Sequence, residues 1–269
     1  MSIFDLSRIQ SEAKLQSLEF HATVDSTNSL AMQLIPDLVD HRPALILTEQ
    51  QTAGRGRGAH QWFSDAGALT FSLVLDAAAI PAAQRSLVSI ATGIAIRSTI
   101  QQTLDNCNQA SGGVSKARHV SVKWPNDVLI DERKVCGVLT ELNTSSDHVS
   151  IVIGVGMNVN NSLASLPAEI QSKATSIFDL CGQSLDLSDL LIQLVQAIQT
   201  SCDRLLVDRQ GIIEELNQAH VLTGKQLQVD LGNQTVNGRC IAVDDDGALL
   251  LDTNGQIQKI VAGSIVHWE

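Results

Sequence analysis

The sequence predicts an α+β protein in which a large domain of interspersed helices and strands is followed by a small β-barrel-like module. Two long runs with helical periodicity, over residues 81–104 and 187–207, lie among short apolar runs of strand character. Toward the C-terminus the period becomes that of strands, and polar turn sequences separate the runs. We therefore expect two domains, over residues 1–220 and 221–269.

The first elements alternate between helix and strand. Apolar residues at helical spacing over 3–18 predict a short amphipathic helix. Residues 25–28 (DSTN) precede a second apolar stripe, and any one of the four can cap that helix. A plain cap needs only one such residue, so the surplus hydroxyl and amide groups are available to a ligand. The apolar runs 44–48 and 69–75 predict buried strands on either side of a loop.

The middle and end of the chain predict further helices and strands. Pro81 suits the first turn of the long helix, and residues 105–119 after it form a polar surface loop. A helix over 187–207 and a shorter one over 211–219 follow a loop with a helical turn over 161–177. The remaining apolar runs predict strands over 120–124, 128–130, 135–142, 151–160, 226–229, 238–243, 249–252 and 257–261.

Composition excludes several classes of function. The formal net charge of -11 argues against a nucleic acid or an anionic membrane as a partner, because both need a basic face. No apolar run reaches the roughly 18 to 20 residues that span a bilayer, and the N-terminus has no signal-peptide core, so we expect a cytoplasmic protein. The five cysteines are scattered without metal-site spacing, which predicts reduced, mostly buried thiols.

Residues 54–58 (GRGRG) form the most distinctive stretch. Glycine lets backbone N–H groups approach an anion closely, and arginine offers a fork of donors to phosphate or carboxylate oxygens. The alternative is a solvated flexible loop, because glycine-rich loops are common. The stretch therefore predicts an anion-binding loop only if other polar clusters accompany it.

A second charged cluster lies on the predicted hairpin. Solvated hairpin charge is the simpler interpretation of Lys123, Asp127 and Lys134. However, Lys134 immediately precedes the apolar residues 135–138, where its ammonium would lie against a low-dielectric wall and could clamp an anion. The chain contains neither a Walker A pattern nor a nucleophile elbow. These clusters together favour a nucleotide-dependent reaction that needs charge neutralisation.

These motifs resemble those of the biotin protein ligases over nearly the whole chain from Asp25. The matching stretches are DSTN (25–28), QQTAGRGRG (50–58), WFS (62–64), KWPND (123–127), RKVCGVLTE (133–141) and GVGMNVN (154–160). The resemblance implies a mixed β-sheet with flanking helices, like the core of class II aminoacyl-tRNA synthetases. It also implies that 1–220 is the catalytic domain and that 221–269 is an SH3-like β-barrel.

The resemblance implies a two-step reaction. Biotin and ATP with Mg²⁺ would give biotinyl-5'-adenylate, and a lysine of the biotin carboxyl carrier protein of acetyl-CoA carboxylase would then take the biotin. The family includes monomers and homodimers. Two alternatives stay open: a lipoate or octanoate ligase of the same core fold, and a non-catalytic biotin-binding regulator.

The resemblance also implies roles for individual residues. The catalytic group would be Lys134, Arg57, Asp127 and Lys123, with Asp127 also a possible Mg²⁺ ligand. Biotin would contact Ser26, Thr27, Asn28, Gln51, Gly54, Arg55, Arg57, Trp62, Lys134, Gly137 and Gly154. ATP and the adenylate would contact Arg57, Trp62, Asn126, Asp127, Lys134 and Asn158. Gly154 and Gly156 would let the ligand approach the strand, and residues 161–177 would cover it.

The sequence departs from the family pattern at two places. Many members have a further glycine and arginine where this chain has Ala59 and His60. A titratable imidazole thus replaces a fixed charge, and we expect weaker or pH-sensitive closure of the loop. Too few residues precede Asp25 for a helix-turn-helix domain, which predicts the ligase-only class without a repressor role.

Overall fold

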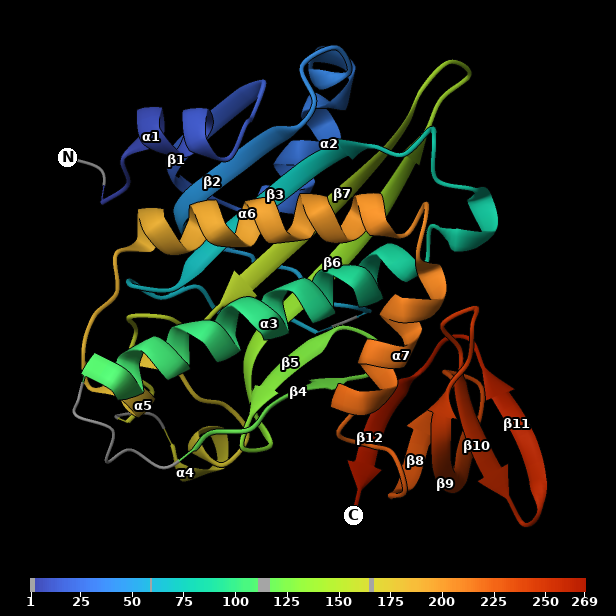
Figure 1. Cartoon of the computed structure of the whole chain (residues 1–269). Coiled ribbons are helices and arrows are strands. Elements are labelled where there is room, and N and C mark those ends of the chain that lie inside the picture. The colour runs from blue at the N-terminus through green and yellow to red at the C-terminus, as the bar shows by residue number, and fades with distance from the viewer. Residues whose placement is uncertain (1–2, 59, 111–116, 165–166) are drawn as a thin grey trace.

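Seven strands form the mixed β-sheet of the large domain (Figure 1). The structure is a computed structural model that describes residues 3–58, 60–110, 117–164 and 167–269. The two strands at one edge pair in parallel and all other neighbours are antiparallel, which confirms the predicted mixed sheet. In spatial order the strands are β1 (Ser17–Val24), β2 (Ala44–Gln51), β3 (Leu69–Asp76), β7 (Val149–Met157), β6 (Arg133–Thr144), β5 (Asp127–Ile130) and β4 (Val120–Lys123).

Helices cover both faces of this sheet. Helices α3 (Leu87–Ala110) and α6 (Leu187–Arg204) lie across one face and enclose the larger apolar core (Figure 1). Helix α2 (Thr27–Leu38) packs on the opposite face, where Ala31, Ile35 and the strand residue Ile46 belong to a second buried apolar cluster. The shorter helices are α1 (Leu6–Glu12), η1 (Ala82–Gln84), α4 (Ala168–Gln171), α5 (Ile177–Cys181) and α7 (Arg209–Ala219).

Several predicted boundaries in the large domain are wrong. The long helix begins at Leu87 and continues to Ala110, so the expected loop does not begin at 105, and residues 111–116 lie outside the described chain. A buried Cys107 and a hydrogen bond from Gln101 Nε2 to the Asp105 carboxylate (3.1 Å) keep the polar end helical. Strand β1 was not predicted, because an edge strand that is half-buried along most of its length lacks a clear apolar alternation.

The segment after β7 also differs from the prediction. Strand β7 ends at Met157, and residues 158–160 lie beyond it. The predicted loop over 161–177 contains the short α4, and α5 follows directly as an element that the sequence did not predict. Residues 165–166 of that loop lie outside the described chain. Helices this short carry too few turns to show a period.

A five-stranded antiparallel sheet forms the C-terminal module, consistent with the expected SH3-like domain. Its order is β11 (Gln256–Ile260), β10 (Leu249–Thr253), β9 (Thr235–Val243), β8 (Gln226–Asp230) and β12 (Ser264–Trp268). The sequence missed β12, whose residues are mostly exposed. The module is joined to the large sheet where Val221 N donates to Val122 O (3.0 Å) and Trp124 Nε1 donates to Gly247 O (2.9 Å).

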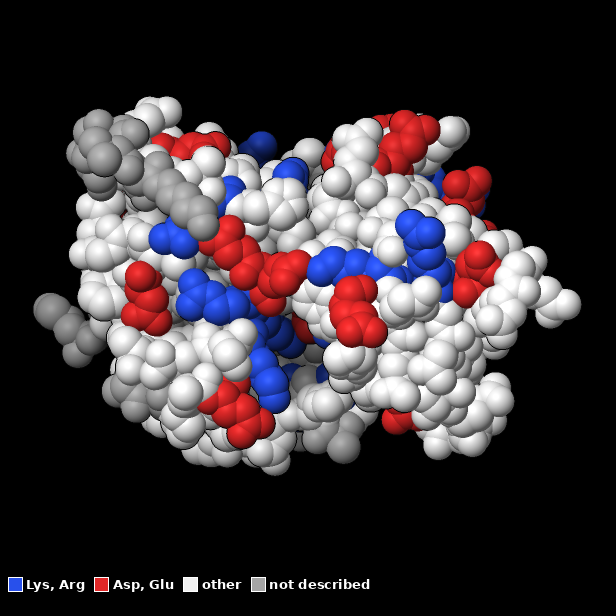
Figure 2. Space-filling model, turned by 90° about the horizontal axis from the view of Figure 1, so that it is seen from below, with Lys and Arg blue, Asp and Glu red and all other residues white. Residues whose placement is uncertain are grey.

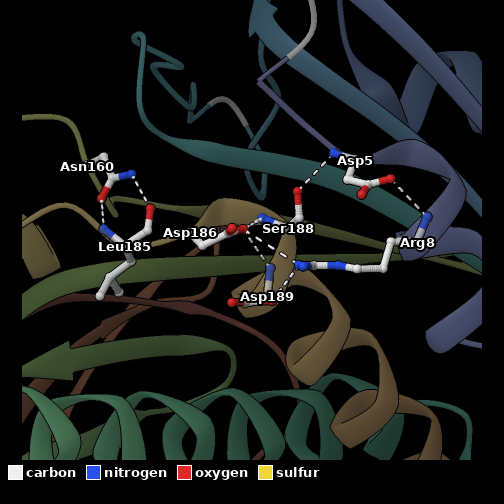
Figure 3. Close-up of polar contacts among 7 residues, drawn as sticks. All are labelled: Asp5, Arg8, Asn160, Leu185, Asp186, Ser188 and Asp189. Carbon is white, nitrogen blue, oxygen red and sulfur yellow. Dashed lines mark hydrogen bonds and ion pairs between the residues drawn. The ribbon is translucent and has the colours of Figure 1, made fainter.

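Polar contacts attach α1 to the start of α6 (Figure 3). The backbone N–H of Asp5 donates to Ser188 Oγ (3.0 Å), and Arg8 forms an ion pair with Asp189. Close by, Asn160 exchanges two hydrogen bonds of 2.9 Å with the backbone of Leu185. The segment after β7 is thus held against the segment that enters α6.

The remaining sequence expectations concern cysteines and membrane segments. All five cysteines are free thiols, and all except the half-buried Cys181 are buried, as predicted. Within the described residues, no helix combines the length and the hydropathy needed to cross a membrane.

Candidate active site

The glycine-arginine stretch folds back on itself as a narrow hairpin. Trp62 N donates to Gly54 O (2.9 Å), and Gly56 N donates to His60 O (2.8 Å). Arg55 and Gln61 form an isolated antiparallel bridge. A Cβ atom on Gly54 would lie 2.3 Å from Trp62 O, so this hairpin can close only with glycine there. We call residues 54–62 the loop hairpin; Ala59 lies outside the described residues.

A cavity of about 330 Å³ lies beneath the loop hairpin. Its wall is formed by the start of α2, the turn between β4 and β5, the paired strands β6 and β7, and residues 263–265 of the C-terminal module. It brings together almost all of the predicted site residues: Ser26, Thr27, Asn28, Gln51, Arg55, Arg57, Trp62, Lys123, Asn126, Asp127, Lys134, Gly137 and Gly154. His60 and Gly156 also line it.

The helix start contributes a polar wall to this cavity. Ser26 is the N-cap of α2, since its side chain accepts from Ser29 N (3.4 Å). Thr27 N donates to Gln51 Oε1 (2.8 Å), and Asn28 lies against Ser72 of β3. Because one residue of DSTN suffices as the cap, the two that follow it line the cavity, as the surplus of polar residues predicted.

The two arginines of the loop hairpin have different partners. Arg55 forms a two-pronged ion pair with Glu141 of β6, at 2.7 and 3.2 Å. Arg57 donates to the carbonyl of Gly263 (3.1 Å) and lies 5.9 Å from the centre of the Trp124 ring. Desolvation lowers the pKa of Arg57, and the nearby Asp127 carboxylate partly opposes that change. Among the described residues, no carboxylate forms an ion pair with Arg57, so its guanidinium is available to an anion.

Lys134 and Asp127 form an ion pair with a 2.6 Å separation between Nζ and Oδ1. The Lys134 backbone is fixed from the other side, because Lys134 N donates to Lys173 O (2.8 Å) and Thr175 N donates to Lys134 O (2.9 Å). Burial lowers the pKa of Lys123, Asp127 raises it, and the neighbouring Lys134 lowers it further. Backbone and side chain both position the Lys134 ammonium at the cavity wall.

Cations outnumber carboxylates along this wall. Arg55, Arg57, Lys123 and Lys134 line it, and Asp127 is the one carboxylate that does so among the described residues. Figure 2 shows Lys and Arg side chains gathered around a hollow on one face of the molecule, although the formal net charge is -11. A local gathering of cations attracts an anionic ligand even when the whole protein is acidic.

Two predicted site residues do not line the cavity. Asn158 Nδ2 donates to Thr175 O (3.1 Å), and its Oδ1 accepts from Asn161 (3.0 Å), so the amide is engaged with the loop that follows β7. Gly54 acts through the geometry of the loop hairpin. A Cβ on Gly154 would lie 2.1 Å from Asn28 Oδ1, and one on Gly156 would lie 2.3 Å from Trp62, so both glycines leave room for these side chains. Both glycines also line the cavity.

Sequence reasoning missed several residues of the site. Glu141 stands in the RKVCGVLTE stretch but had no assigned role, and Ser72 lies within an apolar strand. Both are polar residues within otherwise apolar strands, and a polar group in such a strand needs a hydrogen-bond partner, which is a signal for a role. No sequence pattern around Gly263 indicates a role in the site, since its position beside Arg57 depends on how the C-terminal module packs against the large domain.

Comparison with known proteins defines the class of this chain. The biotin/lipoate A/B protein ligase family model matches residues 20–158, more than half of the chain. The model described as the biotin protein ligase C terminal domain matches residues 223–268. The chain therefore belongs to the biotin protein ligase family.

Individual relatives and structures agree with this assignment. The chain is 31% identical over 255 residues to biotin--[acetyl-CoA-carboxylase] ligase of Paracoccus denitrificans, covering 91% of this chain and 98% of that protein. It is 29% identical over 262 residues to the bifunctional ligase/repressor BirA of Bacillus subtilis, covering 96% and 76%. The fold is similar to biotin protein ligase from Aquifex aeolicus in complex with biotin and ATP, with a TM-score of 0.74, 23% identity and coverage of 94% and 98%.

Proposed function

We propose that the protein attaches biotin to a lysine of a biotin carboxyl carrier protein through a biotinyl-5'-adenylate. The observation that carries the proposal is the cation-rich cavity under the loop hairpin, where Arg57, Lys123 and Lys134 face a single carboxylate within the described chain. Biotin and ATP are both anions, and two of them can share a small site only if fixed cations offset their charge.

The first step joins the two anions. A carboxylate oxygen of biotin attacks the α-phosphorus of ATP, the bond to the β-phosphate breaks, and pyrophosphate leaves. Negative charge builds up on the α-phosphate oxygens in the transition state. Lys134 and Arg57 can stabilise this charge, because both line the cavity and Lys134 is fixed through its backbone.

The second step transfers biotin to the acceptor. The lysine amine attacks the carbonyl carbon of the mixed anhydride, AMP leaves, and the new amide loses a proton. We assign acceptance of that proton to Asp127; its position in the cavity wall beside Lys134 supports this role. The loop hairpin excludes water from the adenylate until the acceptor arrives.

The site offers one carboxylate ligand to the Mg²⁺ that accompanies ATP. No cluster of three or more His, Cys, Asp or Glu side chains that could hold a metal occurs in the described part of the chain. Mg²⁺ bound with a nucleotide needs only one or two carboxylates beside the phosphates. Asp127 can supply one such ligand, and the ion would supply charge neutralisation at the phosphates.

We infer a ligase-only role without transcriptional repression, because a formal net charge of -11 does not favour binding to DNA. A lipoate or octanoate ligase is the alternative for the same fold, and the family model covers both substrate types. The chain's resemblance to relatives named as biotin ligases favours biotin.

Incubating the protein with ATP, Mg²⁺, a carrier domain and either biotin or lipoate tests the proposal. We expect the carrier mass to increase by one biotinyl group only with biotin. Lys134→Ala should slow adenylate formation by about 100-fold or more, as losing a charge-stabilising donor does elsewhere. Lys173→Ala removes an exposed lysine that pairs with Glu169 and serves as the control. Unchanged activity of Lys134→Ala would refute its assigned role, and transfer of lipoate in place of biotin would refute the substrate.

A further inference from the structure

Both arginines of the loop hairpin form hydrogen bonds with residues outside it. Arg55 contacts β6 and the start of α2, and Arg57 contacts the C-terminal module. We propose that Glu141 is a positioning residue whose ion pair with Arg55 holds the loop hairpin closed, while Arg57 remains the arginine that binds the ligand. We call the ion pair between Arg55 and Glu141 the latch. The inference rests on the proposed function, in which the closed hairpin keeps water away from the adenylate.

The Arg55 guanidinium is bound by protein groups on two sides. Its Nη1 and Nη2 atoms donate to the Glu141 carboxylate at 3.2 and 2.7 Å, and Nη1 also donates to Ser29 Oγ at 3.3 Å. Such a two-pronged pair fixes the plane of the guanidinium as well as its position. The Glu141 side chain is 23% exposed, so the pair is partly shielded from water. Glu141 thus occupies the fork of donors that a ligand carboxylate would need.

Arg57 has partners of a different kind. Its guanidinium donates to the carbonyl of Gly263 (3.1 Å) and lies 5.9 Å from the centre of the Trp124 ring. Neither partner carries a net charge, so an anionic ligand can supply the counter-charge to this guanidinium. The two arginines therefore divide the work: Arg55 attaches the hairpin, and Arg57 faces the phosphate.

Glu141 is held in place independently of the loop hairpin. It lies in β6, where it pairs with Val152 of β7, and its carboxylate accepts from Asn28 Nδ2 (2.8 Å). Asn28 Nδ2 also donates to Leu139 O (3.1 Å), so the Asn28 amide keeps its orientation when residue 141 is changed. Glu141 does not line the cavity, whereas Arg55 does. A substitution at Glu141 therefore acts on the attachment of the hairpin and leaves the cavity wall in place.

A latch affects the release and the formation of the adenylate differently. Release follows the fraction of molecules with an open hairpin, whereas formation follows the closed fraction. An increase in the open fraction from about 1% to about 10% speeds release about 10-fold, yet the closed fraction falls only from about 99% to about 90%. A change that damaged the site in general would slow formation as well. Faster release with unchanged formation is therefore the signature of a weakened latch.

Glu141→Gln weakens the latch with almost no change in shape, because it removes the charge and one acceptor oxygen. In the ligand-free variant, hydrogen exchange at the hairpin amides of Gly56 and Trp62 should become about 5-fold faster, since a detached hairpin frays. Release of the adenylate, measured by stopped flow, should increase by a similar factor, as expected for a partly shielded ion pair. The rate of adenylate formation at saturating biotin and ATP should stay within about 2-fold of the parent.

The matched control is Glu132→Gln, which removes another ion pair of the described chain. Glu132 lies in the exposed turn between β5 and β6 and accepts from Lys225 at 2.7 Å, the same length as the shorter contact of the latch. This pair does not involve the loop hairpin. We expect the control to match the parent in hydrogen exchange, adenylate release and adenylate formation.

A double-variant cycle separates a latch from direct binding of biotin by Arg55. Arg55→Gln, Glu141→Gln and the double variant should release the adenylate at about the same rate, because each of them breaks the same pair. Effects that add in the double variant would show that Arg55 contacts the ligand and would overturn the inference. Parent-like hydrogen exchange in Glu141→Gln would also overturn it. Failure of the parent to form an adenylate overturns the proposed function instead, and the exchange measurement still decides whether the latch exists.

Discussion

At the scale of single residues, a glycine in the cavity wall leaves room for a large aromatic side chain. The indole of Trp62 lies directly over Gly156, where a Cβ atom would be 2.3 Å from its ring. Within the described chain, the buried Trp62 Nε1 donor has no hydrogen-bond partner, and Lys134 Nζ lies 5.9 Å from the centre of the ring. The missing Cβ of Gly156 therefore gives the Trp62 indole its place at the cavity wall, close to Lys134.

Gly156→Ala should displace this indole. The added methyl group cannot fit under Trp62, so we expect binding of ATP or biotin to weaken by about 10-fold and tryptophan emission to shift toward longer wavelength. Titration calorimetry and fluorescence measure the two effects. Gly93→Ala is the matched control, because its Cβ would meet only Val122 Cγ1 at 3.7 Å. Unchanged affinity in Gly156→Ala would contradict this role of the glycine.

His60→Arg addresses the departure from the family pattern at the loop hairpin. His60 is exposed and its backbone pairs with Gly56, so the substitution changes the side chain and leaves the hairpin intact. A fixed charge at this position should slow release of the adenylate several-fold, because a guanidinium can pair with its phosphate. Stopped-flow release assays measure this. Equal release rates for the parent and the variant would refute the idea.

At the scale of elements, the long helix α3 packs behind the strands of the site, and one residue in it lowers its stability. Helix α3 spans 24 residues and packs against α6 and the strands β4 to β6. Gly93 lies in its interior, where glycine lowers helix stability. The structure leaves room for a methyl group there, since the nearest atom to an added Cβ is 3.7 Å away.

Gly93→Ala should therefore stabilise the protein. We expect the free energy of unfolding to rise by about 0.5 to 1 kcal/mol, because alanine loses less backbone entropy in a helix than glycine. Urea unfolding of the parent and the variant measures the difference. A loss of stability would contradict the conclusion that a methyl group fits beside Val122.

At the scale of the whole molecule, the junction between the two sheets contains a buried histidine. His220 Nε2 accepts from Trp124 N (3.3 Å), and its Nδ1 lies 3.3 Å from Thr223 Oγ1. Burial lowers the pKa of His220 to about 4. A neutral ring is required, because a protonated Nε2 could not accept from the backbone of the KWPND stretch.

This histidine should make stability depend on pH. The unfolded chain binds a proton near the ordinary value of 6.5 and the folded chain does so only near 4, so stability is fully present above about pH 6.5 and falls as the pH drops toward 4. The loss amounts to about 3 kcal/mol. Denaturant unfolding at several pH values should show a flatter profile for His220→Asn. The control His41→Asn, at an exposed site, should keep the slope of the parent.

The sequence by itself determined the fold class and most of the cavity wall. Period and turn residues gave the long helices and most strands, and the motifs are local stretches whose chemistry can be read without coordinates. The edge strands β1 and β12 were not predicted, because edge strands are only partly buried and their apolar and polar residues alternate weakly. The end of α3 was not predicted, because buried contacts keep a polar segment helical.

Only the tertiary structure decided how distant residues share one site. It placed Glu141 between Arg55 and Asn28, and it placed the Gly263 carbonyl against Arg57. It also showed that the amide of Asn158 is committed to the loop after β7. Such partners come from elements far apart in the chain, and the direction of a hydrogen bond depends on every group in contact. No local pattern of residues contains that information.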